Sequence, residues 1–307
     1  MSAPHDTSPA HRLIPLRQAQ LGEGFQVVRA LPTREQRMVG AWCFLDRLGP
    51  MPLAAGSGMH VGAHPHTCLQ TFTWMMEGEV LHRDSLGTEQ VIRPGQVNLM
   101  TAGRGIAHTE DSLPHSQALH AAQLWIALPP ALADTPPRFE HHADLPEWRE
   151  GRAGQLALTL LAGRHNGHTA PTQVHSPLLG LDILAHGTDT GTLPLQPTFE
   201  YGVLPLHGQV AVNGQALTPD QFLYLPPGDS EIQLHMGAGA RCLLLGGEPF
   251  AQPIHMWWNF VGHSRAYIEQ AQAHWESGDG RFGPVPGSTQ RLAAPPIPWP
   301  HTPPPQG

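Results

Sequence analysis

Apolar residues along this chain gather in short runs, and turns that contain Gly or Pro separate the runs. Most runs have the length of a β-strand. In the first half of the chain the predicted strands cover residues 24–30, 38–45, 69–76, 79–84, 91–92, 96–100 and 119–128. In the second half they cover residues 156–161, 178–185, 199–205, 208–212, 222–225, 232–235 and 241–245. Many short strands with this punctuation predict an all-β sandwich or barrel.

One helix is predicted near the C-terminus, over residues 264–277. Ser264 is a favourable N-cap residue, and Gly278 can take the left-handed conformation that ends a helix. The apolar face of this segment consists of Ile268, Ala271 and Trp275.

Two stretches of the first half have counterparts in the second half. Residues 79–86 parallel residues 209–217, and Arg-Pro-Gly-Gln-Val at 93–97 parallels Thr-Pro-Asp-Gln-Phe at 218–222. These local repeats predict a duplicated barrel. The expected organisation is a loose segment (1–19), a first domain (20–135), a linker near 136–154, a second domain (150–250), an extension with the helix (251–283) and a Pro-rich tail (284–307).

Composition excludes several classes of protein. With 307 residues, 40% of them hydrophobic and 14% charged, the chain is long enough for two globular domains. A formal charge of −8 gives no basic footprint, so we expect no direct binding of nucleic acid. No apolar stretch approaches the length of a transmembrane helix, so no membrane association is expected.

Cysteine usage and the N-terminus indicate the compartment. The three cysteines form no CxxC pair, and the polar N-terminus lacks the apolar core of a signal peptide. Both features predict a cytoplasmic protein. Because closed barrels leave few strand edges open to pairing, a monomer is the expected state.

The candidate chemistry lies in two runs, His64-Pro65-His66 and His108-Thr109-Glu110. Each run places two metal-type ligands at positions i and i+2, and a β-strand points alternate side chains to the same face. If the two runs lie on neighbouring strands, three imidazoles and one carboxylate converge. Such a ligand set suits a divalent cation and leaves positions open for water, dioxygen or a chelating substrate. In the second half, Gln196-Pro197-Thr198 stands at the place of the histidine pair, so no metal ligands are expected there.

These runs belong to a larger set of motifs. The set reads Ala-His-Pro-His-Thr (63–67), Glu-Gly-Glu-Val-Leu-His-Arg-Asp-Ser-Leu-Gly (77–87), Met-Thr-Ala-Gly-Arg-Gly-Ile-Ala-His-Thr-Glu (100–110), Leu-Trp-Ile-Ala-Leu-Pro (124–129) and Gly-Arg-Phe-Gly (280–283). In this combination the chain resembles the pirin family over about residues 20–285. The resemblance implies a bicupin: two antiparallel β-barrel (jelly-roll) domains face to face, with iron in the N-terminal one. By the same resemblance His64, His66, His108 and Glu110 are the metal ligands.

The resemblance implies two classes of function. Some pirins act as quercetin 2,3-dioxygenases, and others are redox-sensing regulators that bind transcription factors. We favour a dioxygenase that cleaves a flavonol such as quercetin, with Fe(2+) as the metal and Glu110 as the base that accepts the substrate's proton. The alternatives are an iron-dependent redox sensor with a protein partner, or an isomerase or lyase acting on another enediol-type substrate. Mn, Co, Ni, Cu or Zn could also occupy this ligand set.

The chain departs from the family pattern after the second histidine, where Thr67-Cys68-Leu69-Gln70 replaces the usual Arg-Gly-Phe-Glu. Gln70 removes one negative charge near the site. In a regular strand Cys68 would share a face with the histidine pair, but we expect it to fill a small apolar gap at a glycine position.

Three further expectations concern the surroundings of the site. The residues Phe72, Trp74 and Met76 have the parity to line the same cavity, although core packing would produce the same pattern. His82 and Asp84, also spaced i and i+2, are expected at a solvated hairpin end. Since ligating imidazoles must be neutral, metal should be lost below about pH 6.

Overall fold

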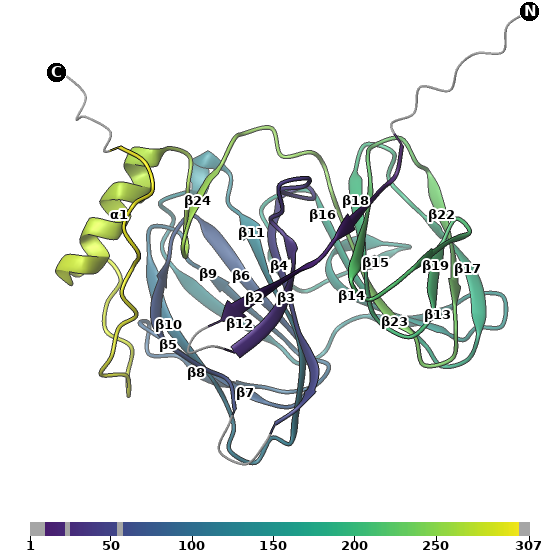
Figure 1. Ribbon diagram of the computed structural model, residues 1–307, viewed down its shortest axis with the longest axis horizontal. Helices are drawn as coiled ribbons and strands as arrows, with labels where there is room; N and C mark the ends of the chain where they lie inside the picture. The colour runs from purple at the N-terminus through teal and green to yellow at the C-terminus, as the bar shows by residue number, and fades with distance from the viewer. Residues whose placement is uncertain (1–9, 22–24, 54–57, 301–307) are drawn as a thin grey trace, which may run out of the picture. The chain divides into compact units, whose positions relative to one another are not determined.

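The computed structural model describes residues 10–21, 25–53 and 58–300, and it divides into two compact units built from antiparallel sheets (Figure 1). Within the described residues, the unit of the first barrel comprises 18–21, 25–29, 43–53, 58–144 and 251–300, and the unit of the second comprises 10–17, 30–42 and 145–250. The prediction of an all-β bicupin is confirmed. The predicted loose segment and tail lie in part, at 1–9 and 301–307, outside the described residues.

The first barrel consists of a seven-stranded and a four-stranded sheet. The larger sheet is formed by Arg17–Leu21 (β2), Phe25–Leu31 (β3), Trp42–Pro52 (β4), Leu69–Glu77 (β6), Val97–Thr101 (β9), Ala118–Ala127 (β11) and Arg138–His142 (β12), in the order β12-β9-β6-β11-β4-β3-β2. The smaller sheet is formed by His60–His66 (β5), Val80–Asp84 (β7), Glu89–Ile92 (β8) and Ile106–Ser112 (β10), in the order β5-β10-β7-β8. One 3-10 turn, Pro130–Leu132 (η1), follows β11.

The second barrel repeats this arrangement. Its larger sheet contains Arg12–Pro15 (β1), Glu147–Glu150 (β13), Leu156–His165 (β14), His168–Thr169 (β15), Leu178–Ala185 (β16), Glu200–His207 (β18), Gln221–Leu225 (β21) and Arg241–Gly247 (β23). Its smaller sheet contains Asp189–Pro194 (β17), Val210–Val212 (β19), Gln215–Leu217 (β20) and Glu231–Met236 (β22).

Apart from β15, which pairs with β14 beside the main order, the strands of the two barrels correspond one to one. The order β1-β21-β18-β23-β16-β14-β13 matches the larger sheet of the first barrel, and β17-β22-β19-β20 matches the smaller one. This correspondence is what the repeated motifs predict. It places β17 and β22 in the roles of β5 and β10, the strands that carry the predicted ligands.

Domain boundaries differ from the expected ones. Of the segment 1–19, expected to be loose, residues 12–15 form β1, which pairs with β21 of the second barrel. Residues 30–42 also belong to the second barrel, where the Gly40 amide donates to Glu200 Oε1 at 2.6 Å. The predicted linker instead holds an edge strand of each barrel, since β12 pairs with β9 and β13 pairs with β14. An apolar pattern identifies a strand but not the sheet that it joins.

The C-terminal extension packs against the strands β5 and β10. The hairpin His255–Trp257 (β24) and Phe260–Gly262 (β25) precedes the helix Arg265–Ser277 (α1). The predicted caps hold, because Ser264 Oγ accepts the Tyr267 amide and Gly278 is left-handed with φ 70°. Buried residues of the extension form a cluster with two alanines of β5 and β10: Ala63, Ala107, Phe260, Ile268, Ala271, Trp275, Phe282 and Val285.

The Pro-rich tail is packed over its described part, residues 284–300, rather than detached. The Leu292 amide donates to Ala63 O at 2.8 Å, and the Arg291 guanidinium lies 3.6 Å from the ring centroid of Trp275. High proline and low apolar content predict an extended or disordered tail, and in the structure Arg291 of this segment forms a parallel bridge with Ala63 of β5. No helix in the described part of the chain is long and apolar enough to span a membrane.

A buried ion pair anchors one wall of the first barrel. Arg29 of β3 donates to both carboxylate oxygens of Asp46 on β4, each at 2.7 Å. The guanidinium also lies 4.4 Å from the ring centroid of Phe44, which stacks on Trp125 at 4.1 Å. Trp125 in turn meets the ring of His66 edge-on at 5.0 Å. A continuous set of contacts therefore connects this ion pair to a predicted ligand.

Replacing Asp46 with Ala should lower the free energy of unfolding by about 3 kcal/mol, because it leaves a largely buried guanidinium without its carboxylate. Urea unfolding of the metal-free protein measures this loss. As a control, Glu89→Ala removes a carboxylate that is 64% exposed and pairs with Arg83, and it should cost less than about 0.5 kcal/mol. Equal losses in the two variants would contradict the assigned role of the ion pair.

Candidate metal centre

Strands β5 and β10 are neighbours, and their register brings the predicted histidines together. His108 lies opposite His64, and Ile106 lies opposite His66. Because side chains at i and i+2 share a face, the imidazoles of His64 and His66 both point toward His108. The ring centroid of His108 is 4.3 Å from that of His64 and 5.0 Å from that of His66. The three candidate ligand nitrogens lie within 4.8 Å of one another.

Hydrogen bonds to carbonyl groups fix which nitrogen of two of these rings carries the proton. His64 Nδ1 lies 2.9 Å from Gly62 O, and His66 Nδ1 lies 3.0 Å from Asn259 O. A carbonyl oxygen only accepts, so in both rings Nδ1 donates a hydrogen and Nε2 keeps its lone pair. The C-terminal extension thus contributes to the centre, through the carbonyl group of Asn259 before β25.

The ring of His108 is oriented by a further histidine, His82, and by Asp84. His108 Nδ1 lies 3.3 Å from His82 Nδ1, and His82 Nε2 lies 3.2 Å from Asp84 Oδ2. An ionised carboxylate only accepts, so His82 donates from Nε2 and accepts the Nδ1 hydrogen of His108. This relay leaves the Nε2 lone pair of His108 free, as in the other two rings. Burial alone would raise the pKa of Asp84, but the bonds from His82 and the turn amides outweigh it and lower this pKa.

The expectation of a solvated hairpin end at His82 and Asp84 is wrong, since both side chains are buried. Strand β7 pairs with β10 and not only with β8, so its inward residues face the centre. The i, i+2 spacing of His82 and Asp84 was the available signal. Sequence could not decide which side of β7 faces the interior.

The three free lone pairs form a cradle for a cation. Nε2 of His66 and Nε2 of His108 are 3.1 Å apart, and two acceptors at this separation have no hydrogen between them. These rings do not readily take up a proton that could bridge the two nitrogens. Burial lowers the pKa of His64 to about 4 and holds the pKa values of His66 and His108 well below the ordinary value for histidine. Three neutral nitrogens with convergent lone pairs suit a divalent metal ion.

Glu110, the fourth predicted ligand, lies beside this cradle. The register between β5 and β10 shifts between His108 and Glu110, so a bulge moves its side chain relative to a regular strand. Its carboxylate groups with the nitrogens of His82 and His108, within 4.8 Å of one another. The structure therefore forms two overlapping ligand groups that share His108. Burial, together with the charge of Asp111, raises the pKa of Glu110 to about 7, although the polar Thr73 hydroxyl beside it opposes the rise.

The walls around the centre come from other residues than expected. Thr73 contacts Glu110 and donates to Gln123 Oε1 at 2.8 Å, so the odd-numbered residues of β6 face the interior. Phe72 and Trp74 point to the opposite face and are core residues of the other side of the sheet. The aromatic surroundings of the histidines are instead Trp125 and Phe139, whose ring stacks on His82 at 4.5 Å.

The two departures from the family pattern are buried. Cys68 has φ 56°, so it does not continue β5 and does not share a face with the histidine pair. A left-handed residue at this point explains why glycine is usual there. Burial raises the pKa of the Cys68 thiol to about 12, so the group stays protonated, in agreement with a space-filling role. Gln70 donates to Thr101 Oγ1 at 3.0 Å.

The second barrel carries apolar residues at the corresponding strands. Inward positions of β17 and β22 belong to its core: Leu193, Ile232, Leu234 and Met236. These side chains offer no ligand atoms suited to a divalent metal. Within the described residues, both groups of candidate ligands lie in the first barrel.

Comparisons with known proteins agree with this geometry. The pirin family model matches residues 24–126, and the pirin C-terminal cupin domain matches residues 180–283. The chain belongs to the pirin family. A Pseudomonas aeruginosa protein provisionally named quercetin 2,3-dioxygenase is 55% identical over 284 residues, which cover 92% of this chain and 89% of that protein. A pirin-like protein of Caulobacter vibrioides is 37% identical over 88% of this chain and 97% of its own length.

A solved structure shows the same fold as this pirin throughout. The crystal structure of a quercetin 2,3-dioxygenase from Acinetobacter baumannii superimposes with a TM-score of 0.92 and 47% identity. The match covers 95% of this chain and 97% of the other.

Replacing His82 with Phe should weaken metal binding by about 10- to 100-fold, because His108 loses the acceptor that fixes its tautomer. The substitution keeps an aromatic ring against Phe139, so the fold should be retained. Competition with a chelator, followed by elemental analysis, measures the affinity. His115→Phe is the control, since that imidazole is exposed and pairs with Glu79 at 2.9 Å. Unchanged affinity in the His82 variant would show that the relay does not act on the metal.

The metal-free protein should become less stable as the pH falls from 6.5 to about 4. The three buried histidines stay neutral in the fold but protonate near pH 6.5 when unfolded, so the unfolded chain binds more protons in this range. Glu110 acts in the opposite sense, because its raised pKa favours the fold at low pH and loses this effect as the pH rises from 4.5 to about 7. Because three histidines destabilise the fold at acid pH and one carboxyl group stabilises it, we expect a net loss in the free energy of unfolding.

Urea unfolding across this pH range measures the effect, and His64→Gln should give a shallower decrease. Stability that stays constant or rises toward acid pH would contradict the burial of neutral imidazoles. The same burial moves the expected limit for metal retention from about pH 6 toward pH 4, since protons compete poorly for these nitrogens.

Proposed function

We propose that this pirin is a metal-dependent dioxygenase that opens the ring of a flavonol such as quercetin. The observation that carries the proposal is the convergence of three neutral imidazoles whose Nε2 lone pairs have no hydrogen to share. Quercetin 2,3-dioxygenase is the name given to the Acinetobacter structure with 47% identity and, provisionally, to the Pseudomonas relative with 55% identity.

His64, His66 and His108 would hold the metal through Nε2, and Glu110 would complete the set through its carboxylate. We propose Fe(2+) as the ion, although Mn, Co, Ni, Cu or Zn also accept nitrogen and oxygen ligands. When bound, the ion supplies a Lewis acid and a redox partner for dioxygen. The ligand side chains are buried, and attraction between the ion and the Glu110 carboxylate is stronger there than in water.

Glu110 would act as the base. Its carboxylate can accept the proton of the 3-hydroxyl group of a flavonol that binds beside His108. Burial and the charge of Asp111 hold the pKa of Glu110 at about 7, and a bound cation would lower it, so the carboxylate could accept a proton at neutral pH. The Thr73 hydroxyl of β6, a strand of the other sheet of the barrel, lies beside this carboxylate.

Aromatic side chains beside the histidines favour a flat substrate. Trp125 is held by stacking on Phe44, and Phe139 is held by stacking on His82. Both rings are anchored by partners that are themselves fixed, so they offer rigid apolar surfaces. A polyphenol has the flat shape and the adjacent oxygen atoms that such a site can bind.

Glu110→Gln should reduce quercetin turnover at least about 100-fold while the protein keeps much of its metal, because the amide retains the shape of the side chain but accepts no proton. Oxygen uptake and carbon monoxide release by the iron-loaded protein measure turnover, and elemental analysis measures the metal. Glu89→Gln is the matched control, since this carboxylate is 64% exposed and pairs with Arg83 at 3.0 Å.

Loss of turnover with the metal retained would support the assignment of Glu110 as the base. If the iron-loaded wild-type protein consumes no oxygen with any of several flavonols, the proposal that it is a flavonol dioxygenase is wrong. In that case a difference between ferrous and ferric protein in the capture of a protein partner would favour a redox-sensing regulator.

A further inference from the structure

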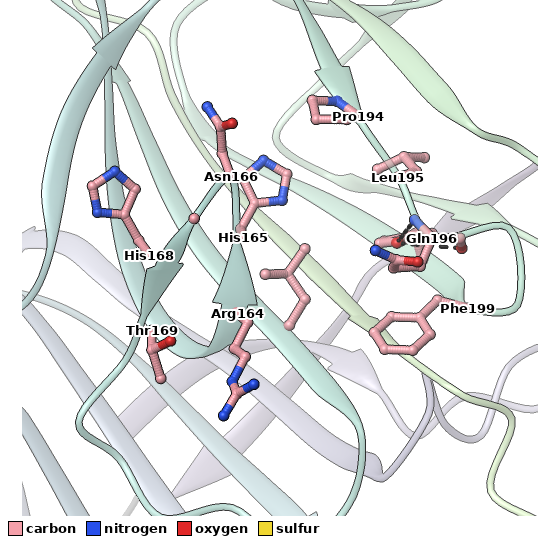
Figure 2. Close-up of a pocket in the computed structure, with 12 residues that line it drawn as sticks. Arg164, His165, Asn166, His168, Thr169, Pro194, Leu195, Gln196 and Phe199 are labelled. Atoms are coloured by element: carbon pink, nitrogen blue, oxygen red, sulfur yellow. Dashed lines mark hydrogen bonds between the residues drawn. The ribbon is translucent and has the colours of Figure 1, made fainter.

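The second barrel contains a pocket of about 520 Å³ between the β14–β15 hairpin and residues 194–199 (Figure 2). Arg164 and His165, which line it, are neighbours on β14, so their side chains point to opposite faces of the strand. His165 Nε2 is buried and out of reach of a ligand. These two residues therefore cannot bind one ligand together. A surface of the first barrel, beside α1, is different, because a segment of the chain itself already occupies it.

Residues 288–300, which we call the tail segment, lie beside α1 and β5 (Figure 1). Trp275 Nε1 donates to Leu292 O at 2.9 Å, and Gln272 Nε2 donates to Pro295 O at 3.0 Å. The two donors are three residues apart on the helix, so they share one face of it. The two acceptors are also three residues apart, and the tail segment runs antiparallel to the helix.

Side chains of the tail segment follow the same period. The Arg291 guanidinium lies 3.6 Å from the ring centroid of Trp275, and Ala294 and Ile297 pack against the apolar cluster of the extension. A period of three residues is that of a polyproline II helix, which proline-rich sequences favour. Donors for every third carbonyl group and an aromatic ring beneath the chain are how grooves for proline-rich peptides bind their ligands.

Trp299 holds the far end of the tail segment. Its Nε1 donates to Glu269 Oε1 at 2.7 Å, the Arg265 guanidinium lies 5.4 Å from its ring centroid, and the Trp257 ring meets it edge-on at 6.0 Å. An arginine at one end and a tryptophan at the other therefore fix the direction in which the segment lies along α1.

The other side of the tail segment covers β5, the edge strand of its sheet. The Leu292 amide donates to Ala63 O at 2.8 Å, and a methyl group added to Gly62 would lie 3.2 Å from the Leu292 side chain. Gly62 O is the acceptor that fixes the tautomer of His64. Leu292 thus contacts the two residues that precede a candidate metal ligand.

We propose that α1 and the edge of β5 form a binding site for a proline-rich peptide, and that a peptide in this site strengthens metal binding at His64. The chain's own tail segment is the resident occupant. A proline-rich segment of another chain can exchange with it, since the contacts are hydrogen bonds and side-chain packing. The peptide site is independent of the flavonol chemistry, whereas its coupling to the metal rests on the role proposed above for His64.

Fluorescence anisotropy with a labelled peptide that has the sequence of residues 288–300 tests the site. The full-chain double variant Arg291→Gln, Trp299→Ala removes two contacts of the tail segment and leaves α1 and β5 unchanged. It should bind the peptide saturably. Wild-type protein should bind it at least about tenfold more weakly, because the resident tail segment competes at a high effective concentration. Equal binding to the two proteins, or no binding to the variant, would overturn the proposal.

Two tryptophan substitutions in the double variant locate the peptide. Trp275→Phe should weaken its binding about fivefold, because the substitution removes the donor to Leu292 O and keeps an aromatic ring. Trp148→Phe removes an indole donor from the second barrel and should leave the affinity unchanged. Equal affinities in these two variants would place the peptide elsewhere and overturn the site.

A second peptide tests the polyproline conformation. Glycine in place of Pro295, Pro296 and Pro298 should weaken binding at least about tenfold, since the flexible peptide must lose more conformational entropy. Equal binding of the two peptides would contradict recognition of a proline-rich segment.

Competition with a chelator for Zn(2+), used as the probe ion, measures the coupling to His64. Leu292→Pro removes the amide hydrogen that Ala63 O accepts, and it should weaken Zn(2+) binding at least about tenfold. Ala293→Pro is the matched control, since Ala293 is exposed and its amide has no hydrogen-bond partner in the described part of the chain. Its Zn(2+) affinity should stay that of the wild type.

Addition of the proline-rich peptide to the double variant should restore Zn(2+) affinity to the wild-type value, a rescue that a general loss of stability would not show. Unchanged affinity in the Leu292 variant, or no rescue, would overturn the coupling. A wild-type protein that binds no Zn(2+) would instead contradict the metal role of His64, and with it the coupling, while the peptide titration decides the site separately.

Discussion

The centre of the first barrel depends on one constraint: three imidazoles must all present lone pairs to the same point. Neighbouring histidines more commonly relieve this repulsion by sharing a hydrogen. Here each ring has already given its only hydrogen elsewhere, to Gly62 O, Asn259 O or His82 Nδ1. The repulsion therefore persists in the metal-free fold, and it is tolerated because the surrounding sheets hold the rings in place.

The partners that take these hydrogens come from widely separated parts of the chain. One is a backbone carbonyl within β5 itself, one lies before β25, and one is a side chain of β7 supported by Asp84. A second set of contacts reaches the His66 ring through Trp125. Trp125 stacks on Phe44, which in turn contacts the guanidinium of the Arg29–Asp46 pair. Orientation of the ligands is thus a property of the whole barrel and not only of the two motifs.

Sequence predicted the parts of this site that depend on local spacing. The i, i+2 runs predicted His64, His66, His108 and Glu110 as candidate ligands, and the three imidazoles lie together because alternation along a strand is a local property. The sequence analysis did not predict the features of the site that depend on strand register or on irregular backbone conformation. The bulge that displaces Glu110, the inward face of β7 and the left-handed turn at Cys68 each reverse or interrupt the parity from which faces are inferred.

The fold shows the same division between local and distant information. Repeated turn motifs predicted the duplication, and the matching strand orders agree with it. The partner sheets of β1, β12 and β13 could not be predicted, since edge strands pair with whichever edge is near in space. The packed tail was missed for the same reason, as its contacts with β5 are made by backbone groups that composition does not reveal.

The distribution of the first barrel along the chain has a consequence for its synthesis. The histidines at 64, 66 and 108 leave the ribosome early, but the carbonyl group that orients His66 belongs to residue 259. All of the sequence between residues 145 and 250, which builds the other barrel, is translated in between. A nascent chain can therefore pair β5 with β10 long before the Asn259 carbonyl group is available to orient His66.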